Sequence, residues 1–202
     1  MASPPRALTV QGAVLGALVL LNTAIELALL AADHGLWAWP GLRGLVYDYG
    51  AFMPWLLHGA PGLFPGQAAA MFVTHGFLHA GLAHLLGNMI ALASLGRWII
   101  ARLGLQAFLA IYFAAMLAGA AAFALWPSGQ GPMVGASGAI FGLAGAMAAL
   151  RTNRLLRIAT ELALLNLALW LLTGGLLAWQ AHLGGFLAGF TLVRIRRVPA
   201  RG

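Results

Sequence analysis

Six long runs of apolar residues alternate along the chain with short gaps that hold most of its polar residues. The runs cover approximately residues 10–31, 83–100, 105–125, 137–150, 158–174 and 181–193. An α-helix rises about 1.5 Å per residue, so the first three runs are about long enough to cross roughly 30 Å of hydrocarbon, and the last three look short. The pattern predicts an all-α, polytopic membrane protein that forms one domain over residues 1–202, with a short cytoplasmic tail at 198–202.

The composition agrees with a membrane protein, because 62% of the residues are apolar and only 7% are charged. A soluble domain of this size would carry far more charge on its water-facing positions. The net charge of +7 does not indicate nucleic acid as a partner, since the basic residues lie mainly in gaps between apolar runs and form no stripe with interleaved aromatic residues. The chain has no cysteine, which excludes disulfides, thiolate metal sites and a cysteine nucleophile.

Arginine placement predicts the orientation of the six segments. All eleven basic residues are arginine, and ten of them fall before the first run, between runs two and three, between runs four and five, or after run six. Arg43 is the exception, in the long gap between runs one and two. Cytoplasmic loops are enriched in basic residues, so we expect both termini to be cytoplasmic.

The gap at residues 32–82 is too aromatic for a solvated linker. Its tryptophans and prolines are Trp37, Trp39, Pro40, Pro54, Trp55, Pro61 and Pro65. Tryptophan prefers the headgroup zone of a bilayer, so this gap is predicted to be an interfacial segment on the outer leaflet.

Three polar residues are predicted to lie at one depth in the membrane. Ser137, His182 and His84 precede the next cytoplasmic arginine by 14, 12 and 13 residues, respectively. These spacings place all three about 18–21 Å above the cytoplasmic boundary. Asn88 lies one turn deeper than His84 on the same helix face. Any one of these residues alone is better explained as a helix–helix hydrogen bond, but their convergence favours a shared wet cavity.

Small residues predict that the helix of Ser137 and the helix of His182 approach closely. They are Gly135, Gly138, Gly142 and Gly145 around the serine, and Gly185 and Gly189 after the histidine. Such spacing lets helix backbones come into contact in a membrane. The segment 129–134 would then reach into the membrane as irregular backbone, which is tolerated where it lines a cavity.

This arrangement matches the needs of a serine nucleophile. A hydroxyl becomes reactive when a base removes its proton, and His182 is the best-placed base for Ser137. His84 and Asn88, together with the Ser137 backbone N–H, can donate hydrogen bonds to an oxyanion. No carboxylate lies at the same depth, so the sequence predicts a Ser–His dyad without an acidic third member.

Three sequence boxes resemble those of the rhomboid family of intramembrane serine proteases. Residues 135–142 (GASGAIFG) are similar to its G-x-S-G box, residues 181–189 (AHLGGFLAG) to its A-H-x-x-G-x-x-x-G box, and residues 75–88 (HGFLHAGLAHLLGN) to its second-helix motif ending in H-x-x-x-N. The resemblance implies a bacterial-type bundle of six transmembrane helices. The expected location is a bacterial inner (plasma) membrane, with the active site opening to the outer side. Many family members carry a Trp-Arg pair before the second helix, where this chain has Ala70-Met71.

The same resemblance implies roles for individual residues. Ser137 and His182 match the catalytic dyad, and His84 and Asn88 match the oxyanion site. Phe141 matches an aromatic position that packs against the catalytic imidazole. The substrate would be a single-span membrane protein cut near the outer leaflet, with the fifth span and the loop above it as a gate. No metal and no cofactor is implied.

Two other functions remain open from the sequence. One is a catalytically inactive rhomboid-like protein that binds membrane clients, and the other is a small transporter with broken helices.

Three isolated features need separate interpretations. His75 and His79 are predicted to make structural hydrogen bonds rather than to form a metal site with His84. Glu26 is either functional, or neutral and hydrogen-bonded, or close to an end of the first span if that span is shifted. Asn166 is predicted to make an interhelical contact.

Overall fold

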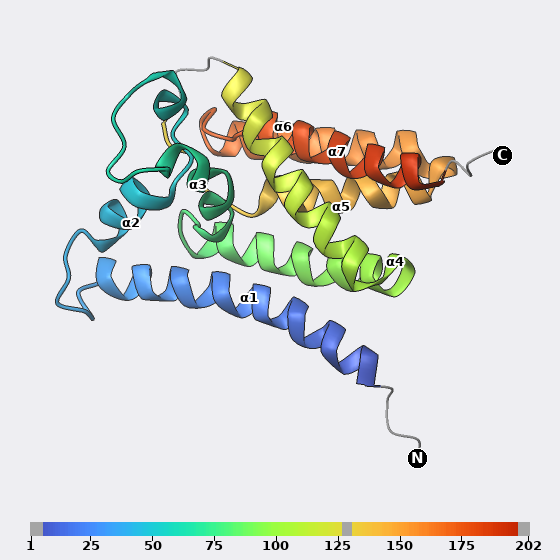
Figure 1. Cartoon of the computed structure of the whole chain (residues 1–202), viewed down its shortest axis with the longest axis horizontal. Coiled ribbons are helices and arrows are strands. Elements are labelled where there is room, and N and C mark those ends of the chain that lie inside the picture. The colour runs from blue at the N-terminus through green and yellow to red at the C-terminus, as the bar shows by residue number, and fades with distance from the viewer. Residues whose placement is uncertain (1–5, 127–130, 198–202) are drawn as a thin grey trace. The chain divides into compact units, whose positions relative to one another are not determined.

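The computed structural model describes residues 6–126 and 131–197, which fold into helices joined by turns and short irregular segments (Figure 1). The α-helices are α1 (Arg6–Asp33), α2 (Leu42–Gly50), α3 (Gln67–Thr74), α4 (Leu82–Leu125), α5 (Ser137–Leu150), α6 (Leu155–Leu172) and α7 (Trp179–Arg197), and the 3-10 helices are η1 (Pro54–His58), η2 (His75–Phe77) and η3 (Thr152–Arg154). Within the described residues the only β-pairing is an isolated bridge between Phe52 and Met133. The prediction of an all-α fold is confirmed. The predicted tail at 198–202 lies outside the described residues.

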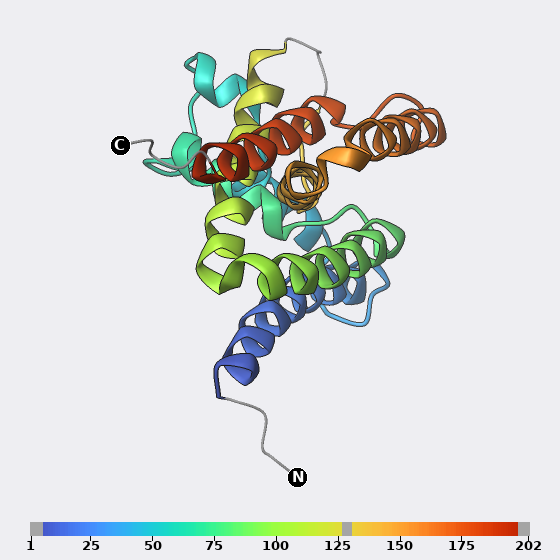
Figure 2. The same cartoon turned by 90° about the vertical axis from the view of Figure 1, so that its right-hand side faces the viewer.

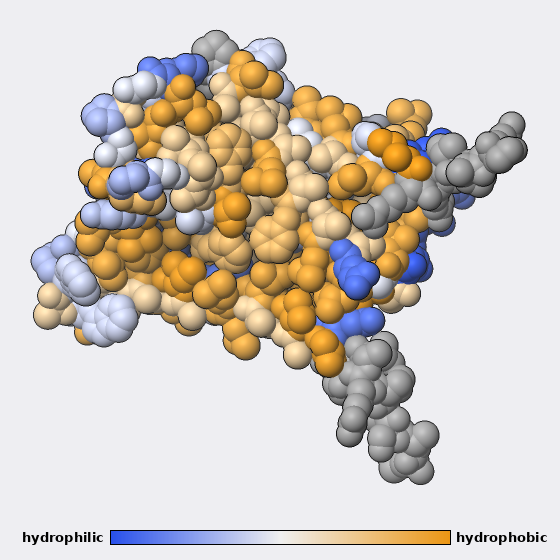
Figure 3. Space-filling view, viewed as in Figure 1, coloured by the Kyte–Doolittle hydropathy of each residue, from blue (hydrophilic) through white to orange (hydrophobic). Residues whose placement is uncertain are grey.

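Long apolar helices make this chain a polytopic membrane protein. Three segments of the described residues are long and apolar enough to cross a bilayer, namely Val10–Asp33, Leu82–Leu125 and Thr152–Leu172. Helix α5 is a shorter apolar helix. Many of their leucines point outward, and most of the face seen in Figure 3 is hydrophobic. Leu156 and Leu172, for example, are 81% and 83% exposed. Surfaces of this kind are stable against lipid rather than water.

The predicted break between the second and third apolar runs occurs inside α4. Gly104 has φ 82° and ψ 168°, which is far from helical geometry. A residue with a side chain is strained at such a φ, whereas glycine adopts it readily. Gly104 therefore ends one helical segment and lets the next begin.

The structure divides into two compact units, so the prediction of one domain over residues 1–202 remains a prediction. The first unit contains residues 1–109 and 132–136. In it α1 runs beside the first part of α4 (Figures 1 and 2). A Cβ atom at Gly96 of α4 would lie 2.8 Å from a Leu15 methyl group, so the missing side chain makes room for α1.

The loop at residues 32–82 is built from short helices and holds the segment that precedes Ser137. Backbone N–H groups of Phe52 and Met133 each donate to the other residue's carbonyl at 2.9 Å. The N–H of Gly135 donates to the carbonyl of His75 at 2.9 Å. Gly135 has φ 128°, a conformation that other residues rarely adopt. The expected irregular segment is thus anchored at residues 132–136, whereas residues 127–130 lie outside the described residues.

The second unit contains residues 110–131 and 137–202, which include the end of α4 together with α5, α6 and α7. Helices α5 and α7 pack backbone against backbone. A Cβ atom at Gly185 would collide with the carbonyl of Gly138, and one at Gly189 with the carbonyl of Gly142. Helix α6 stands to one side of α7 in Figure 2, and most of its residues are exposed. The close approach predicted from small residues is therefore present between α5 and α7.

Candidate active site

Ser137 and His182 lie next to each other in the second unit. Ser137 is the first residue of α5, and His182 lies in the first turn of α7. The Ser137 Oγ atom is 2.7 Å from the His182 Nε2 atom, which is a hydrogen-bonding distance. Both residues therefore meet at the N-terminal ends of two tightly packed helices.

Glycines explain why this pair is so close. The backbones of α5 and α7 touch at Gly138 and Gly185, one residue after the serine and three after the histidine. The contact repeats one turn further on at Gly142 and Gly189. A side chain at Gly185 or Gly189 would collide with these α5 carbonyls, push the two helices apart and lengthen the Ser137–His182 distance.

The imidazole of His182 is held on its face as well as at its edge. The ring of Phe141 lies parallel to it, with ring centroids 4.1 Å apart and an angle of 5° between the planes. Phe141 lies one turn after Ser137, so both side chains come from the same face of α5. The stacked ring of Phe141 holds the plane of the His182 imidazole. In this plane the Nε2 atom points at Ser137.

Asn166 of α6 is a third polar residue in this cluster. Its Oδ1 atom lies 2.6 Å from the Nδ1 atom of His182. The sequence predicts an interhelical contact for Asn166, which is confirmed, but it does not identify His182 as the partner. The signal in the sequence is one amide side chain within an otherwise apolar span, and its partner depends on the packing of α6.

A mostly apolar cavity of about 490 Å³ lies beside His182 in the second unit. Its lining residues come from α5, α6 and α7, and they are Phe141, Ala159, Leu162, Ala163, Asn166, Leu167, Trp170, Trp179, His182, Leu183 and Phe186. The polar cluster thus borders a space large enough for apolar side chains.

The residues predicted to form an oxyanion site belong to the first unit. His84 lies in the first turn of α4, where its Nδ1 atom accepts a hydrogen bond from the Ala80 N–H at 3.3 Å. Asn88 is buried, and its Nδ2 atom donates to the carbonyl of His84 at 2.9 Å. Their role toward an oxyanion remains a prediction.

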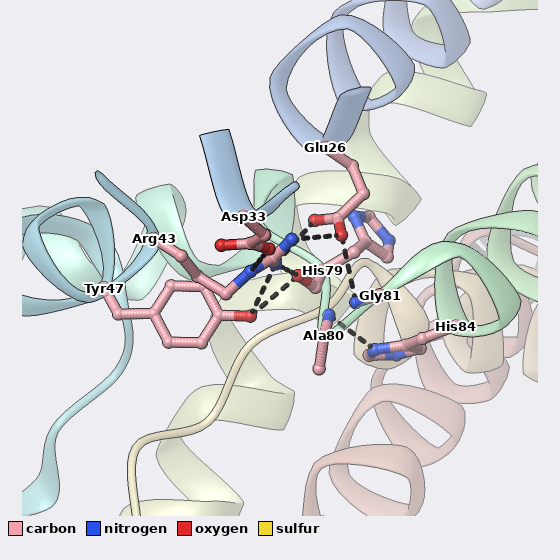
Figure 4. Close-up of polar contacts among 8 residues, drawn as sticks. All are labelled: Glu26, Asp33, Arg43, Tyr47, His79, Ala80, Gly81 and His84. Carbon is pink, nitrogen blue, oxygen red and sulfur yellow. Dashed lines mark hydrogen bonds and ion pairs between the residues drawn. The ribbon is translucent and has the colours of Figure 1, made fainter. Parts of the chain in front are cut away.

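A second polar cluster surrounds Arg43 in the first unit (Figure 4). Arg43 donates to both carboxylate oxygens of the fully buried Glu26, at 3.1 and 2.8 Å, and to Asp33 at 2.6 Å. Burial alone would lower the pKa of Arg43, but the hydrogen bonds to Glu26 and Asp33 outweigh it and raise this pKa. Of the possibilities left open for Glu26, the structure shows the hydrogen-bonded side chain, but in an ion pair with Arg43 rather than neutral.

This cluster ties α1 and α2 to the turn that begins α4. Arg43 also donates to the carbonyl of His79 at 2.9 Å, and Glu26 accepts the N–H of Gly81 at 3.0 Å. Tyr47 donates to the same His79 carbonyl at 2.7 Å. This network could not be predicted from the sequence, because Glu26 and Arg43 lie in segments with different predicted environments.

His75 and His79 lie near the end of the loop, just before α4. The Nδ1–H of His75 donates to the carbonyl of Met71 at 2.7 Å, which confirms the predicted structural hydrogen bond. His79 is fully buried, with its ring edge-on to His84 at 5.1 Å between centroids. Within the described residues neither ring nitrogen of His79 has a hydrogen-bond partner, so the structural hydrogen bond predicted for His79 is wrong. Burial lowers the pKa of His75 to about 4 and that of His79 to about 3. Among the described residues, no three histidine, cysteine or acidic side chains cluster closely enough to hold a metal ion.

These features define an α-helical polytopic membrane protein with a hydrogen-bonded serine and histidine at the ends of two packed helices. The family model for the Rhomboid domain matches residues 66–198, which is well over half of the chain. The chain therefore belongs to the rhomboid family.

Curated relatives support this family assignment. RHOMBOID-like protein 5 of Arabidopsis thaliana is 40% identical over 124 residues, which are 57% of this chain and 40% of the relative. Rhomboid protease GluP of Bacillus subtilis (strain 168) is 34% identical over 133 residues, which are 62% of this chain and 25% of the relative. RHOMBOID-like protein 6, mitochondrial, of Arabidopsis thaliana is 36% identical over 134 residues, which are 63% of this chain and 43% of the relative. The matched stretch spans less than half the length of each of these relatives.

Proposed function

We propose that this protein is an intramembrane serine endopeptidase in which Ser137 is the nucleophile and His182 its general base. The observation that carries the proposal is the 2.7 Å contact between Ser137 Oγ and His182 Nε2. A serine next to a base is the minimum requirement for acyl transfer. The relative named Rhomboid protease GluP supports the same chemistry.

The proposed reaction has two halves. His182 Nε2 takes the Ser137 proton while Oγ bonds to the carbonyl carbon of a substrate peptide bond. The protonated His182 then gives this proton to the leaving amine as the C–N bond breaks, which leaves an acyl-serine. In the second half His182 takes a proton from water, the hydroxide attacks the ester, and the proton returns to Ser137 as the new carboxyl terminus leaves.

The negative oxygen that forms in each half needs hydrogen-bond donors. Ser137 begins α5, and N–H groups in the first turn of a helix have no acceptor within the helix. The Ser137 N–H is therefore a suitable donor. His84 and Asn88 are proposed as the side-chain donors on the basis of the H-x-x-x-N motif in α4.

The proposed substrates are single-span membrane proteins. The proposed location is a bacterial inner membrane with both termini in the cytoplasm and the site open toward the outer side, because ten of the eleven arginines fall on one side of the predicted spans. The alternative of an inactive client-binding protein gives no reason for a serine and a histidine to share a hydrogen bond at the contact of α5 and α7.

Cleavage of a model single-span protein by the purified enzyme in detergent tests this proposal. We expect wild type to cut the substrate once near one end of its transmembrane segment. Ser137→Ala and His182→Ala should each lower the rate by about three orders of magnitude or more. Client binding by wild type without cleavage would instead support the inactive alternative.

A further inference from the structure

We propose that Asn166 is a positioning residue that selects the tautomer of His182 required of a general base. The inference rests on the proposed function for its catalytic consequence. It concerns a third side chain that neither the sequence boxes nor the comparisons single out, and it follows from the direction of three consecutive hydrogen bonds.

The first bond determines which way the Asn166 amide points. Its Nδ2 group donates to the carbonyl of Leu162, one turn earlier in α6, at 3.1 Å. Turning the amide over would place its oxygen against that carbonyl, and two acceptors cannot form a hydrogen bond. The Oδ1 atom therefore faces His182.

The second bond determines where the proton of His182 lies. The Asn166 Oδ1 atom can only accept, so the His182 Nδ1 atom at 2.6 Å must carry a hydrogen and donate it. In a neutral imidazole with a protonated Nδ1, the Nε2 atom has a free lone pair.

The third bond follows from the second. The Nε2 lone pair faces the Ser137 hydroxyl at 2.7 Å, so this hydroxyl is the donor. The opposite tautomer would put an N–H against the serine oxygen and could not remove its proton. Asn166 thus holds His182 ready to act as a base, without itself taking a proton.

The surroundings offer His182 no equivalent substitute on this side. Among the described residues that line the adjacent cavity, Asn166 is the only one besides His182 whose side chain can accept a hydrogen bond. Two of the others are tryptophans, which only donate, and the rest are apolar. Removing the amide therefore removes the side-chain acceptor that faces the Nδ1 atom of His182.

Kinetic comparison of three variants tests this role. Asn166→Leu removes the acceptor, Asn166→Asp keeps an acceptor of the same size, and Leu165→Ala changes a neighbouring, 48% exposed side chain of α6 as a matched control. Only 6% of the α6 span is buried, so these variants should fold. We expect Asn166→Leu to lower kcat about 10- to 100-fold with KM within about twofold, the size of one lost hydrogen bond to a catalytic base. Asn166→Asp should recover most of this loss, and Leu165→Ala should match wild type.

Two outcomes would overturn the inference. One is a wild-type kcat in Asn166→Leu. The other is a lower kcat in Asn166→Leu that comes with a lower melting temperature and is not recovered in Asn166→Asp. That pattern would indicate a merely structural role for Asn166.

A spectroscopic readout separates this inference from the proposed function. ¹⁵N NMR of the histidine rings, assigned through His182→Gln, should show a protonated Nδ1 in wild type and a mixture of tautomers in Asn166→Leu. This measurement needs no turnover. If the wild-type protein shows a protonated Nδ1 but cleaves no substrate, the proposed protease function is contradicted and the role of Asn166 in selecting the tautomer is supported. If the wild-type protein shows a protonated Nε2, only the role of Asn166 is contradicted.

Discussion

The ring of Phe141 lies flat against the imidazole of His182, with centroids 4.1 Å apart and planes 5° apart. Because Phe141 and Ser137 are one helical turn apart on α5, one helix supplies both the proposed nucleophile and the ring that orients its proposed base. The geometry of the proposed site therefore depends on the face of α5 as much as on α7.

Loss of the Phe141 ring should reduce activity without preventing folding. A stacked ring pair contributes about 0.5–1.5 kcal/mol, so Phe141→Leu is expected to lower kcat/KM about 2- to 10-fold. Phe141→Tyr keeps the ring and should remain within about twofold of wild type. Cleavage rates for the two variants give this comparison, and equal rates for Phe141→Leu and wild type would exclude an orienting role for the stack.

The glycine contact between α5 and α7 should not tolerate a methyl group at Gly189. Gly189→Ala would place a Cβ atom against the carbonyl of Gly142, so the helices must separate. We expect a destabilisation of about 1–3 kcal/mol, seen as a lower melting temperature in detergent, together with a loss of activity. Gly16→Ala is the control, because a Cβ at Gly16 of α1 meets no atom within 4 Å. Equal melting temperatures for the two variants would contradict the packing of α5 on α7.

The buried Arg43–Glu26 pair should be far more sensitive than an exposed pair. Arg43→Met leaves the carboxylate of Glu26 buried without its cation, which typically costs about 3–5 kcal/mol. The control is Arg157→Met, since Arg157 and Glu161 form a pair on α6 in which both side chains are largely exposed. We expect a large drop in melting temperature for Arg43→Met and no measurable change for Arg157→Met. If Glu26→Gln combined with Arg43→Met is no more stable than Arg43→Met alone, the uncompensated charge is not the cause.

Stability should fall as the pH is lowered below about 6.5. The unfolded chain binds protons at His75 and His79 near their ordinary pKa of about 6.5, whereas burial lowers these pKa values to about 4 and about 3 in the folded chain. The stabilisation is thus complete above pH 6.5 and is lost as the pH falls, at up to about 1.4 kcal/mol per pH unit for each group.

His79→Phe isolates one of these two groups. Within the described part of the chain, neither ring nitrogen of His79 has a hydrogen-bond partner, so phenylalanine loses no bond there. Melting temperatures between pH 7 and pH 5 should fall less steeply for His79→Phe than for wild type. Parallel curves would show that His79 does not stay neutral in the folded protein.

The membrane-spanning helices could be predicted from the sequence because their signal is local. The run at 10–31 corresponds to α1, the runs at 83–100 and 105–125 to the two parts of α4, and the run at 137–150 to α5. Length and apolar content determine such segments with little help from the rest of the chain. The Ser137–His182 contact could also be anticipated, since arginine boundaries give depth and glycines give closeness.

Contacts that join distant polar residues could not be predicted in the same way. Asn166 and His182 are 16 residues apart, and their bond depends on how α6 packs beside α7. Glu26 and Arg43 are 17 residues apart, and their pairing depends on the short helix α2, which no strong apolar pattern marks. Sequence periodicity describes one helix at a time, whereas these bonds are determined by the packing of two.

Labelling with a fluorophosphonate tests the central claim most directly, because this reagent phosphonylates only a serine that a base has activated. The purified protein is labelled in detergent, and the modified residue is identified by mass spectrometry. The account predicts an adduct on Ser137 that is absent in Ser137→Ala and strongly reduced in His182→Ala. The account would be contradicted if properly folded wild-type protein took up no label at Ser137. It would also be contradicted if His182→Ala took up as much label as wild type.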